Sequence, residues 1–226
     1  MSLENKIKEV LEKIETARKA SPFNQKVDLI AATKTRDISQ IQDCYKFGVL
    51  NIGENRIQEA EKKFIEFPGF NQLKKRFIGH LQTNKVNKCL HLFDTIDSVD
   101  SLRLAKKINS SSTEKKTECL IEINTSKEPQ KHGFNPIISE GLISCFTLKN
   151  LEIVGLMTIG PHTSEEKKTR NAFKLLRKLK EDINSELGEH KIKELSMGMS
   201  GDFEIGVQEG STMVRVGTGI FGARNY

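Results

Sequence analysis

The sequence contains neither a long hydrophobic run nor a secretory leader. Its apolar segments stay well short of the roughly 18 uncharged residues that a membrane-spanning helix needs. The N-terminal segment MSLENKIKEVLEKIETARKA is charged and amphipathic, unlike a signal peptide. We therefore expect a soluble, cytoplasmic protein without a membrane partner.

Cysteine is scarce and scattered. The four cysteines, Cys44, Cys89, Cys119 and Cys145, form no C-x-x-C pair. This spacing suggests neither a disulfide framework nor a zinc site. We expect each cysteine to be a reduced, half-buried packing residue, and we expect no metal site.

The chain also lacks linkers, internal repeats and low-complexity tracts. Its 226 residues, 36% of them hydrophobic, can bury one large core. The polar stretch NSSSTEKKTE, residues 109–118, is expected to be a loop between a helix and a strand. We expect a single domain over residues 1–226.

The charge balance is basic but not clustered. The net charge is +6 and the isoelectric point is near 9.0. Lysines and arginines alternate with acidic residues along helical segments such as 165–182. This pattern favours solvated helix faces over a binding patch, so we expect no nucleic-acid partner.

Hydrophobic periodicity alternates between strand and helix along the chain. The N-terminal segment, about 3–20, repeats apolar residues at helical spacing. Strand-like apolar runs follow at 27–34, 49–53, 76–80, 92–97, 118–124, 151–157, 192–197 and 213–217. Helix-like stretches separate them at 37–47, 54–66, 83–91, 99–112, 135–147, 165–187 and 202–209. Eight parallel strands predict an α/β fold, a single (β/α)8 barrel of the TIM type with an extra N-terminal helix.

Two glycine-rich stretches, LSMGMSGDFE and VRVGTGIFGAR, follow the last two predicted strands. In such barrels the loops after strands seven and eight often hold a phosphate. Ser200, Gly201, Gly217 and Thr218 lie in these loops, where unpaired backbone N–H groups at helix starts favour an anion. We predict a phosphate site here; the alternative is that the glycines only form tight turns.

Other strand ends carry residues that could act on a phosphorylated ligand. Lys34 lies at the tip of the first strand, where partial desolvation favours a nucleophilic amine that can form a Schiff base. The same ring of strand ends includes Asn55, His80, Met157 and Thr158, and Arg215 points inward from the last strand. A lysine at a rim is more often solvated, and His80 could instead cap the helix near Thr83. Together, these residues fit a ligand with an aldehyde and a phosphate, as in pyridoxal 5′-phosphate.

Eight segments in order resemble the pyridoxal phosphate homeostasis protein family. They are LIAATKTR, NIGENRIQEA, FIGHLQTNK, IDSVDS, INTSKEPQKHGF, VGLMTIG, LSMGMSGDFE and GSTMVRVGTGIFGAR, and they run from the first strand to the C-terminus. The resemblance implies a barrel of the alanine racemase N-terminal type, fold type III of the enzymes that use this vitamin B6 coenzyme.

The resemblance also implies a set of site residues. Lys34 would hold the coenzyme as a Schiff base, Ser200, Gly217 and Thr218 would bind its phosphate, Arg215 would face the pyridine nitrogen, and Asn55 and His80 would line the ring. An acidic residue is common in the family where this chain has Gly201, which leaves the contacts of that loop open. The KEPQKHGF segment is an ordinary variant of its loop.

The same residues bear on catalysis. An arginine at the ring nitrogen cannot keep that nitrogen protonated, which handicaps carbanion chemistry. Racemases of this type add a tyrosine from a C-terminal domain, whereas this chain ends at Tyr226 and its other tyrosine, Tyr45, falls in a predicted outer helix. We expect no turnover and no catalytic residue. The resemblance implies a protein of intracellular coenzyme homeostasis that affects amino-acid and keto-acid metabolism.

Two other functions remain open from the sequence. A small amino-acid racemase that uses the coenzyme is the first alternative, and a lysine aldolase acting on a sugar phosphate is the weaker second one. We expect pyridoxal phosphate as the ligand, with amino acids as possible further ligands and apoenzymes as possible recipients of the coenzyme. Because a closed barrel has no exposed strand edge, we expect a monomer.

Overall fold

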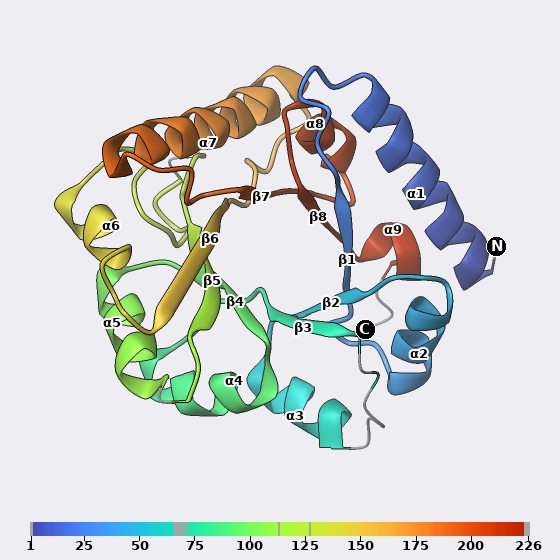
Figure 1. Ribbon diagram of the computed structural model, residues 1–226. Helices are drawn as coiled ribbons and strands as arrows, with labels where there is room; N and C mark the ends of the chain where they lie inside the picture. Colours follow the sequence, from blue (N-terminus) through green and yellow to red (C-terminus); the bar gives the residue numbers. More distant parts are fainter. Residues whose placement is uncertain (1, 66–69, 71, 113, 127, 224–226) are drawn as a thin grey trace.

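The computed structural model describes residues 2–65, 70, 72–112, 114–126 and 128–223. Within them, eight parallel strands close into a barrel in the order β1 to β8, and helices surround it (Figure 1). The strands are β1 Asp28–Ala32, β2 Asn51–Glu54, β3 Lys74–Phe77, β4 Thr95–Val99, β5 Thr117–Glu122, β6 Leu151–Met157, β7 Glu194–Met199 and β8 Met213–Val216. The predicted barrel of the TIM type is confirmed.

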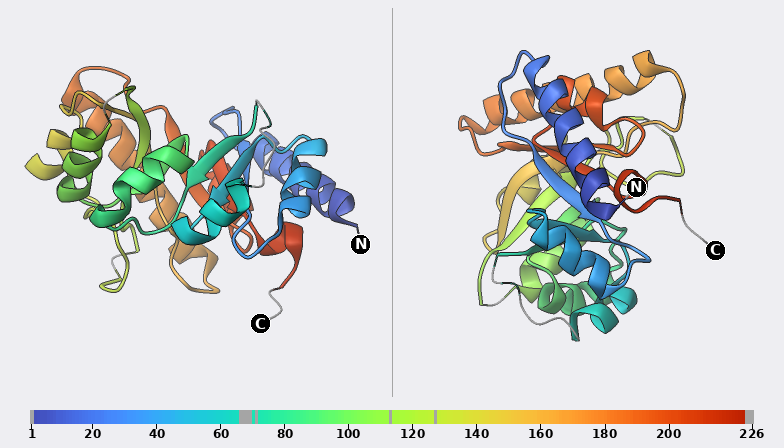
Figure 2. Two further views of the ribbon diagram at one scale, coloured as in Figure 1. Left: turned by 90° about the horizontal axis from the view of Figure 1, so that it is seen from below. Right: turned by 90° about the vertical axis from the view of Figure 1, so that its right-hand side faces the viewer.

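The described α-helices comprise α1 before the first strand and one helix after each strand. They are α1 Leu3–Lys19, α2 Ile38–Lys46, α3 Ile57–Ile65, α4 Val86–Leu92, α5 Leu102–Ser111, α6 Glu140–Cys145, α7 Glu166–Leu187, α8 Phe203–Gln208 and α9 Thr218–Phe221, with the 3-10 turn η1 Thr83–Lys85 before α4. Views from below and from the right-hand side show the helices packed around the outside of the strands (Figure 2). None of the described helices has the length and hydrophobicity needed to cross a bilayer.

The predicted N-terminal helix is α1, which covers one side of the barrel (Figure 1). The Ser2 side chain caps its start by accepting a hydrogen bond from the Asn5 backbone N–H at 3.2 Å. Its buried face packs on outward-facing residues of β1 and β8 and on helices α8 and α9. Because β1 and β8 are the first and last strands, α1 covers the seam at which the barrel closes.

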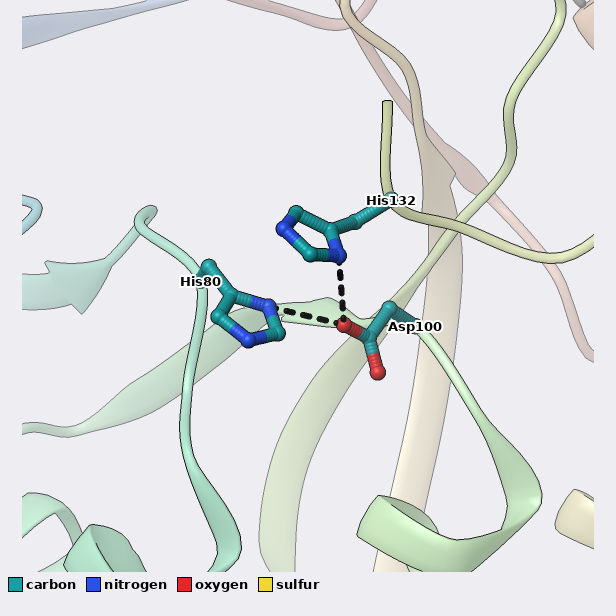
Figure 3. Close-up of side chains that lie close together, drawn as sticks. All are labelled: His80, Asp100 and His132. Carbon is teal, nitrogen blue, oxygen red and sulfur yellow. Dashed lines mark hydrogen bonds and ion pairs between the residues drawn. The ribbon is translucent and has the colours of Figure 1, made fainter. Parts of the chain in front are cut away.

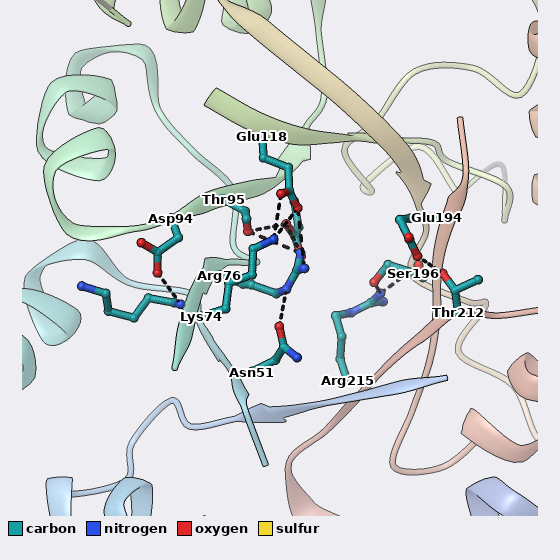
Figure 4. Close-up of polar contacts among 12 residues, drawn as sticks. Asn51, Lys74, Arg76, Asp94, Thr95, Glu118, Glu194, Ser196, Thr212 and Arg215 are labelled. Atoms are coloured by element: carbon teal, nitrogen blue, oxygen red, sulfur yellow. Dashed lines mark hydrogen bonds and ion pairs between the residues drawn. The ribbon is translucent and has the colours of Figure 1, made fainter. Parts of the chain in front are cut away.

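Polar side chains occupy part of the barrel interior (Figure 4). Side chains alternate along a strand, so apolar residues such as Leu29 and Ala31 face the helices, whereas every second residue faces inward. Arg76 on β3 lies inside and donates to both carboxylate oxygens of Asp97, each at 3.1 Å. Arg215 on β8 also extends inward. Burying such charges is tolerated because each has hydrogen-bonding partners.

Several element boundaries differ from the predicted ones. Strand β3 begins two residues before the predicted run 76–80, and its first residue, Lys74, forms an ion pair with Glu118 of β5. Helix α6 is shorter than predicted, since Ser139 caps its start. A short helix, α9, also follows the last strand, where only a turn was expected.

The cysteines are more buried than predicted. All four are free, and each is 0% exposed rather than half-buried. Burial raises the pKa of the Cys44 and Cys145 thiols to about 12. These cysteines are therefore unreactive packing residues at neutral pH.

Candidate functional site

A cavity of about 570 Å³ opens at the C-terminal ends of the barrel strands. Eight of the ten residues that the sequence singled out line it: Lys34, Asn55, His80, Ser200, Gly201, Arg215, Gly217 and Thr218. A space of this volume is typical of small-molecule sites. The other two, Met157 and Thr158, are buried and do not line it.

Lys34 lies just beyond the end of β1, in a tight turn at the cavity wall. A hydrogen bond from the Arg36 N–H to the Thr33 carbonyl, at 2.9 Å, closes this turn. Thr35 has a φ of 65°, a left-handed conformation that β-branched residues rarely adopt, and its N–H donates to the Glu59 carboxylate. Such strain persists only where the surroundings hold it. The half-buried Lys34 is thus presented by a fastened turn.

A buried lysine from helix α3 supports the Lys34 turn from behind. Lys63 Nζ donates to the Thr33 carbonyl at 2.9 Å, to Glu54 Oε1 at 2.8 Å and to Glu59 Oε1 at 2.7 Å. The Thr33 hydroxyl also donates to Glu54 Oε1, at 2.7 Å. Burial raises the pKa of Glu54, whereas the Lys63 charge lowers it. This network joins the ends of β1 and β2 to α3.

Ser200 joins the two glycine-rich loops. Its Oγ accepts hydrogen bonds from the backbone N–H groups of Gly217 and Gly219, both at 3.1 Å. A Cβ at Gly217 would lie 3.3 Å from the Ala32 carbonyl oxygen, so this backbone packs closely on the end of β1. Thr218 follows as an exposed residue. Hydroxyls and backbone N–H groups gathered in this way suit a phosphate.

Arg215 places a fixed positive charge at the base of the cavity (Figure 4). Its guanidinium donates to the Ser196 carbonyl at 2.9 Å, to Ser196 Oγ at 2.6 Å and to the Thr158 carbonyl at 2.7 Å. Burial lowers the pKa of Arg215, and the Asp97 carboxylate is first among the groups that raise it. The guanidinium nevertheless stays charged at neutral pH.

Asn55 presents an unpartnered oxygen near the end of β2. Among the buried side-chain polar atoms of the described residues, Glu54 Oε2 and Asn55 Oδ1 lack a hydrogen-bond partner. Gly79 packs so closely that a Cβ there would lie 2.3 Å from the Asn55 carbonyl oxygen. Buried polar atoms normally have partners. Because Asn55 lines the cavity, its oxygen is a candidate hydrogen-bond acceptor for a ligand group.

His80 contacts an acidic residue rather than a helix start. Its Nδ1 lies 2.9 Å from Asp100 Oδ2, and its ring stacks on that of His132 with the centroids 3.7 Å apart (Figure 3). The N-cap of the following 3-10 turn is Gln82. His80 therefore does not cap a helix, and the alternative role considered for it is wrong.

Met157 does not line the cavity. Its side chain is 1% exposed and belongs to a cluster of Ile30, Leu120 and Met213. The prediction placed it at the rim because Met157 ends strand β6. Its side chain instead packs with apolar residues of β1, β5 and β8.

Comparisons with known proteins assign the chain to a family. Residues 7–225 match the family described as alanine racemase, N-terminal domain. The pyridoxal phosphate homeostasis protein of Haemophilus influenzae is 38% identical over 234 residues, which cover 100% of this chain and 98% of that protein. The chain belongs to the pyridoxal phosphate homeostasis protein family.

Solved structures agree with this family membership. PipY of Synechococcus elongatus PCC7942, in a structure with PLP bound, has a TM-score of 0.84 at 30% identity; the match covers 98% of this chain and 100% of PipY. An alanine racemase of Clostridium difficile has a TM-score of 0.72 but is 18% identical, and the match covers 98% of this chain and 57% of the racemase. The likeness to the racemase is therefore one of fold alone.

Gly201 marks the departure of this pyridoxal phosphate homeostasis family member from the acidic residue expected there. A Cβ at Gly201 would meet no atom within 4 Å. A side chain at this position would project into open space, so glycine leaves no packing defect. In this protein Ser200, rather than its neighbour, makes the contacts between the two loops.

The sequence interpretation missed Glu122, which ends β5 and lines the cavity. Burial raises its pKa to about 7; Asp100 acts in the same direction and Arg215 lowers it. Strand alternation could have indicated this residue, because Glu122 follows Leu120 at a spacing of two and shares its inward face. The polar loop residues Lys131 and His132, also on the cavity wall, carried no such signal.

Proposed function

We propose that this protein binds pyridoxal 5′-phosphate covalently through Lys34 and serves as an intracellular carrier of the coenzyme. One observation carries the proposal: Lys34 and the loops of Ser200, Gly217 and Thr218 line the same cavity. The names of two similar proteins support it. The Haemophilus influenzae relative is named for pyridoxal phosphate homeostasis, and the PipY structure has PLP bound.

Each residue then has a definite task. Bound pyridoxal phosphate supplies an aldehyde that bonds to a primary amine and a phosphate that needs hydrogen-bond donors. Lys34 would hold the aldehyde carbon, and Ser200 with the backbone of Gly217 and the Thr218 hydroxyl would hold the phosphate. Arg215 would face the pyridine nitrogen. Asn55 and His80 would line the ring.

The residues present fit this ligand. Asn55 Oδ1 is a buried acceptor that lacks a hydrogen-bond partner among the residues that the structure describes. Ser200 Oγ accepts from the Gly217 and Gly219 N–H groups, which holds the two loops together at the cavity wall and leaves the Ser200 hydroxyl hydrogen to donate to a phosphate. Arg215 is held by three hydrogen bonds to Ser196 and Thr158, and its charge is therefore fixed in place. Preorganised donors lower the cost of binding.

A carrier role fits the cavity better than an enzymatic one. A charged arginine does not keep a pyridine nitrogen protonated. Beside Arg215, the bound coenzyme would therefore be a weak electron sink. Tyr45 stacks on Phe70 with ring centroids 4.2 Å apart and does not line the cavity; Tyr226 lies outside the described residues. Exposed His80 and His132 stand at an accessible mouth, which suits coenzyme exchange.

The partners follow from the same proposal. We include amino acids as ligands of the loaded protein and apoenzymes as recipients of the coenzyme, with no nucleic-acid or membrane partner. Residues 1–226 would act as a single-domain monomer in the cytoplasm. The closed barrel supports this, since its strands all pair with neighbours.

Borohydride reduction tests the covalent attachment. The protein is loaded with pyridoxal phosphate, reduced, digested and mapped by mass spectrometry. The expected label lies on the peptide containing AATKTR, and Lys34→Ala should abolish it while leaving the circular dichroism spectrum unchanged. Lys131→Ala is the matched control, because Lys131 also lines the cavity. A label on Lys85, Lys88 or Lys131 in the wild-type protein would refute the assignment.

A further inference from the structure

Three metal-ligating side chains converge at the mouth of the cavity (Figure 3). His80 comes from the loop after β3, Asp100 from the loop after β4 and His132 from the loop after β5. Both imidazoles direct Nδ1 toward the same carboxylate oxygen: Asp100 Oδ2 lies 2.9 Å from His80 Nδ1 and 3.9 Å from His132 Nδ1. One possible ligand atom from each residue lies within 4.8 Å of the other two.

We propose that His80, Asp100 and His132 bind a divalent transition-metal ion such as Zn²⁺. Two imidazoles and one carboxylate form a ligand set that suits zinc and related ions, with further coordination positions left for water or another ligand. This proposal goes beyond the carrier function and does not depend on it. It also departs from the sequence-based expectation, which considered only the spacing of the cysteines.

Hydrogen bonds hold the Asp100 side chain and the backbone next to His80 in place. The Ser101 hydroxyl donates to Asp100 Oδ1 at 3.0 Å, which leaves Oδ2 directed at the histidines. Ser98 donates to the Gly79 carbonyl at 2.5 Å and so fastens the residue before His80. A hydrogen bond such as that from Ser101 orients a ligating carboxylate, whereas the Ser98 bond fixes the backbone next to His80.

The loop that carries His132 is fastened on both sides. Asn124 Nδ2 donates to the Glu128 carbonyl at 2.9 Å and to the Lys131 carbonyl at 3.3 Å. On the other side, the Phe134 N–H donates to the Glu122 carbonyl at 2.8 Å. His132 is therefore held near its partners although its side chain is 55% exposed.

Binding requires a small movement of the two rings. They are nearly parallel, with 12° between their planes, whereas an ion lies close to the plane of each imidazole that binds it. Zinc–nitrogen distances of about 2.1 Å place ligand atoms about 3.4 Å apart in a tetrahedral site. Both histidine side chains are about half exposed, at 44% and 55%, so the rings can tilt without disturbing the core.

Titration of the coenzyme-free protein tests the proposal. Hydroxylamine removes bound coenzyme and a chelator removes metal, after which Zn²⁺ is titrated by calorimetry and Co²⁺ by its visible absorption. We expect one ion per chain and intense cobalt bands typical of low coordination number. His80→Asn and His132→Asn should each weaken Zn²⁺ binding at least tenfold, because each removes one ligand.

The matched control is His91→Asn, because His91 is an exposed histidine on α4, away from this cluster. It should bind Zn²⁺ like the wild type, and circular dichroism should show that all variants fold. The proposal is wrong if wild-type protein takes up no stoichiometric ion, or if His80→Asn and His132→Asn bind Zn²⁺ as tightly as wild type. Since the titration contains no coenzyme, either result leaves the labelling of Lys34 to be judged separately.

Discussion

Lys63 Nζ lies 2.9 Å from the backbone carbonyl of Thr33, the residue that precedes Lys34. Its other two acceptors are carboxylates, those of Glu54 and Glu59. Lys63 is 11% exposed and Glu54 is fully buried, so this is an ion pair inside the protein rather than on its surface. It connects a helix on the outside of the barrel with the turn that carries the predicted coenzyme lysine.

Replacing Lys63 with methionine should destabilise the protein strongly. The change leaves the buried Glu54 without its positive partner, and breaking one side of a buried pair costs about 3 kcal/mol or more. We expect a loss of that size in the free energy of unfolding, measured by urea denaturation. Lys62→Met is the matched control, because Lys62 is exposed on the same helix. The Lys62→Met change should alter the free energy of unfolding by no more than about 0.5 kcal/mol.

A double variant separates charge from packing at this site. In Lys63→Met with Glu54→Gln, the fully buried charge is gone and only the half-buried Glu59 has lost its cation, so most of the stability lost in Lys63→Met should return. The Lys34 turn should still be loosened, because Thr33 has lost a donor, and coenzyme attachment should be slower than in the wild type. Equal stability of Lys63→Met and Lys62→Met would contradict the role of the pair.

The phosphate loops give a second prediction. Ser200→Ala and Thr218→Val each remove a hydroxyl that could bond a charged oxygen, a contact worth roughly 1.5–3 kcal/mol. Affinity for pyridoxal phosphate should therefore fall about ten- to hundredfold, as measured by absorption titration. Ser110→Ala, at an exposed position of helix α5, serves as the control.

Unphosphorylated pyridoxal makes this prediction specific. It still offers the aldehyde to Lys34, but it has no phosphate for Ser200 or Thr218 to contact. Its affinity should change far less than that of pyridoxal phosphate in both variants. Equal losses for the two ligands would mean that these loops do not bind the phosphate.

Glu122 should make stability depend on pH. Burial raises its pKa from 4.5 to about 7, so between these pH values the folded protein keeps a proton that the unfolded chain has released. Stability should thus fall as pH rises through this window and stay lower above it. Glu122→Gln cannot lose that proton. The free energy of unfolding of this variant should therefore exceed that of the wild type by an amount that grows with pH, to about 3 kcal/mol above pH 7.

Urea denaturation at about pH 5 and about pH 8 measures this difference. Glu152→Gln provides the control, because Glu152 is an exposed glutamate on the neighbouring strand β6. Its unfolding free energy should follow the wild type at both pH values. If the unfolding free energy of Glu122→Gln differs from that of the wild type by the same amount at both pH values, the buried carboxyl does not titrate as described.

Strand-end residues were predictable because parallel strands of a barrel end at one face. Knowing that Lys34 and Ser200 end or follow strands was enough to place both at that face. The same reasoning failed for Met157, because a strand's last residue can still point into the interior, where Ile30 and Leu120 contact it. Lys74 was missed for another reason: the predicted strand began at residue 76, although Lys74 pairs with Glu118 as the first residue of β3.

Contacts between distant loops were beyond the sequence. Lys63 meets Thr33 across 30 residues, and nothing in the spacing of the two indicates it. Likewise, His132 approaches His80 and Asp100 only because β3, β4 and β5 are neighbours in the closed barrel. Such contacts depend on loop conformation, which hydrophobic periodicity does not describe.

The last prediction is that the loaded protein does not turn over amino acids at an enzymatic rate. Arg215 cannot hold the pyridine nitrogen protonated, and no tyrosine among the described residues lines the cavity. A positioned acid or base typically contributes about a hundred- to ten-thousandfold of rate, so the lack of a second base is a large handicap. His80 is the residue that could replace it, because Asp100 holds its ring at the cavity wall.

Incubating the loaded protein with L-alanine in deuterated water measures this directly. NMR follows exchange of the α-proton, and chiral chromatography follows D-alanine. We expect at most slow exchange and no sustained racemisation, because a single face of the substrate would meet a base. His80→Asn should change little, and His91→Asn controls for the loss of an exposed imidazole. Steady production of D-alanine that disappears in His80→Asn would make the protein a racemase, with His80 bonded to Asp100 as its second base.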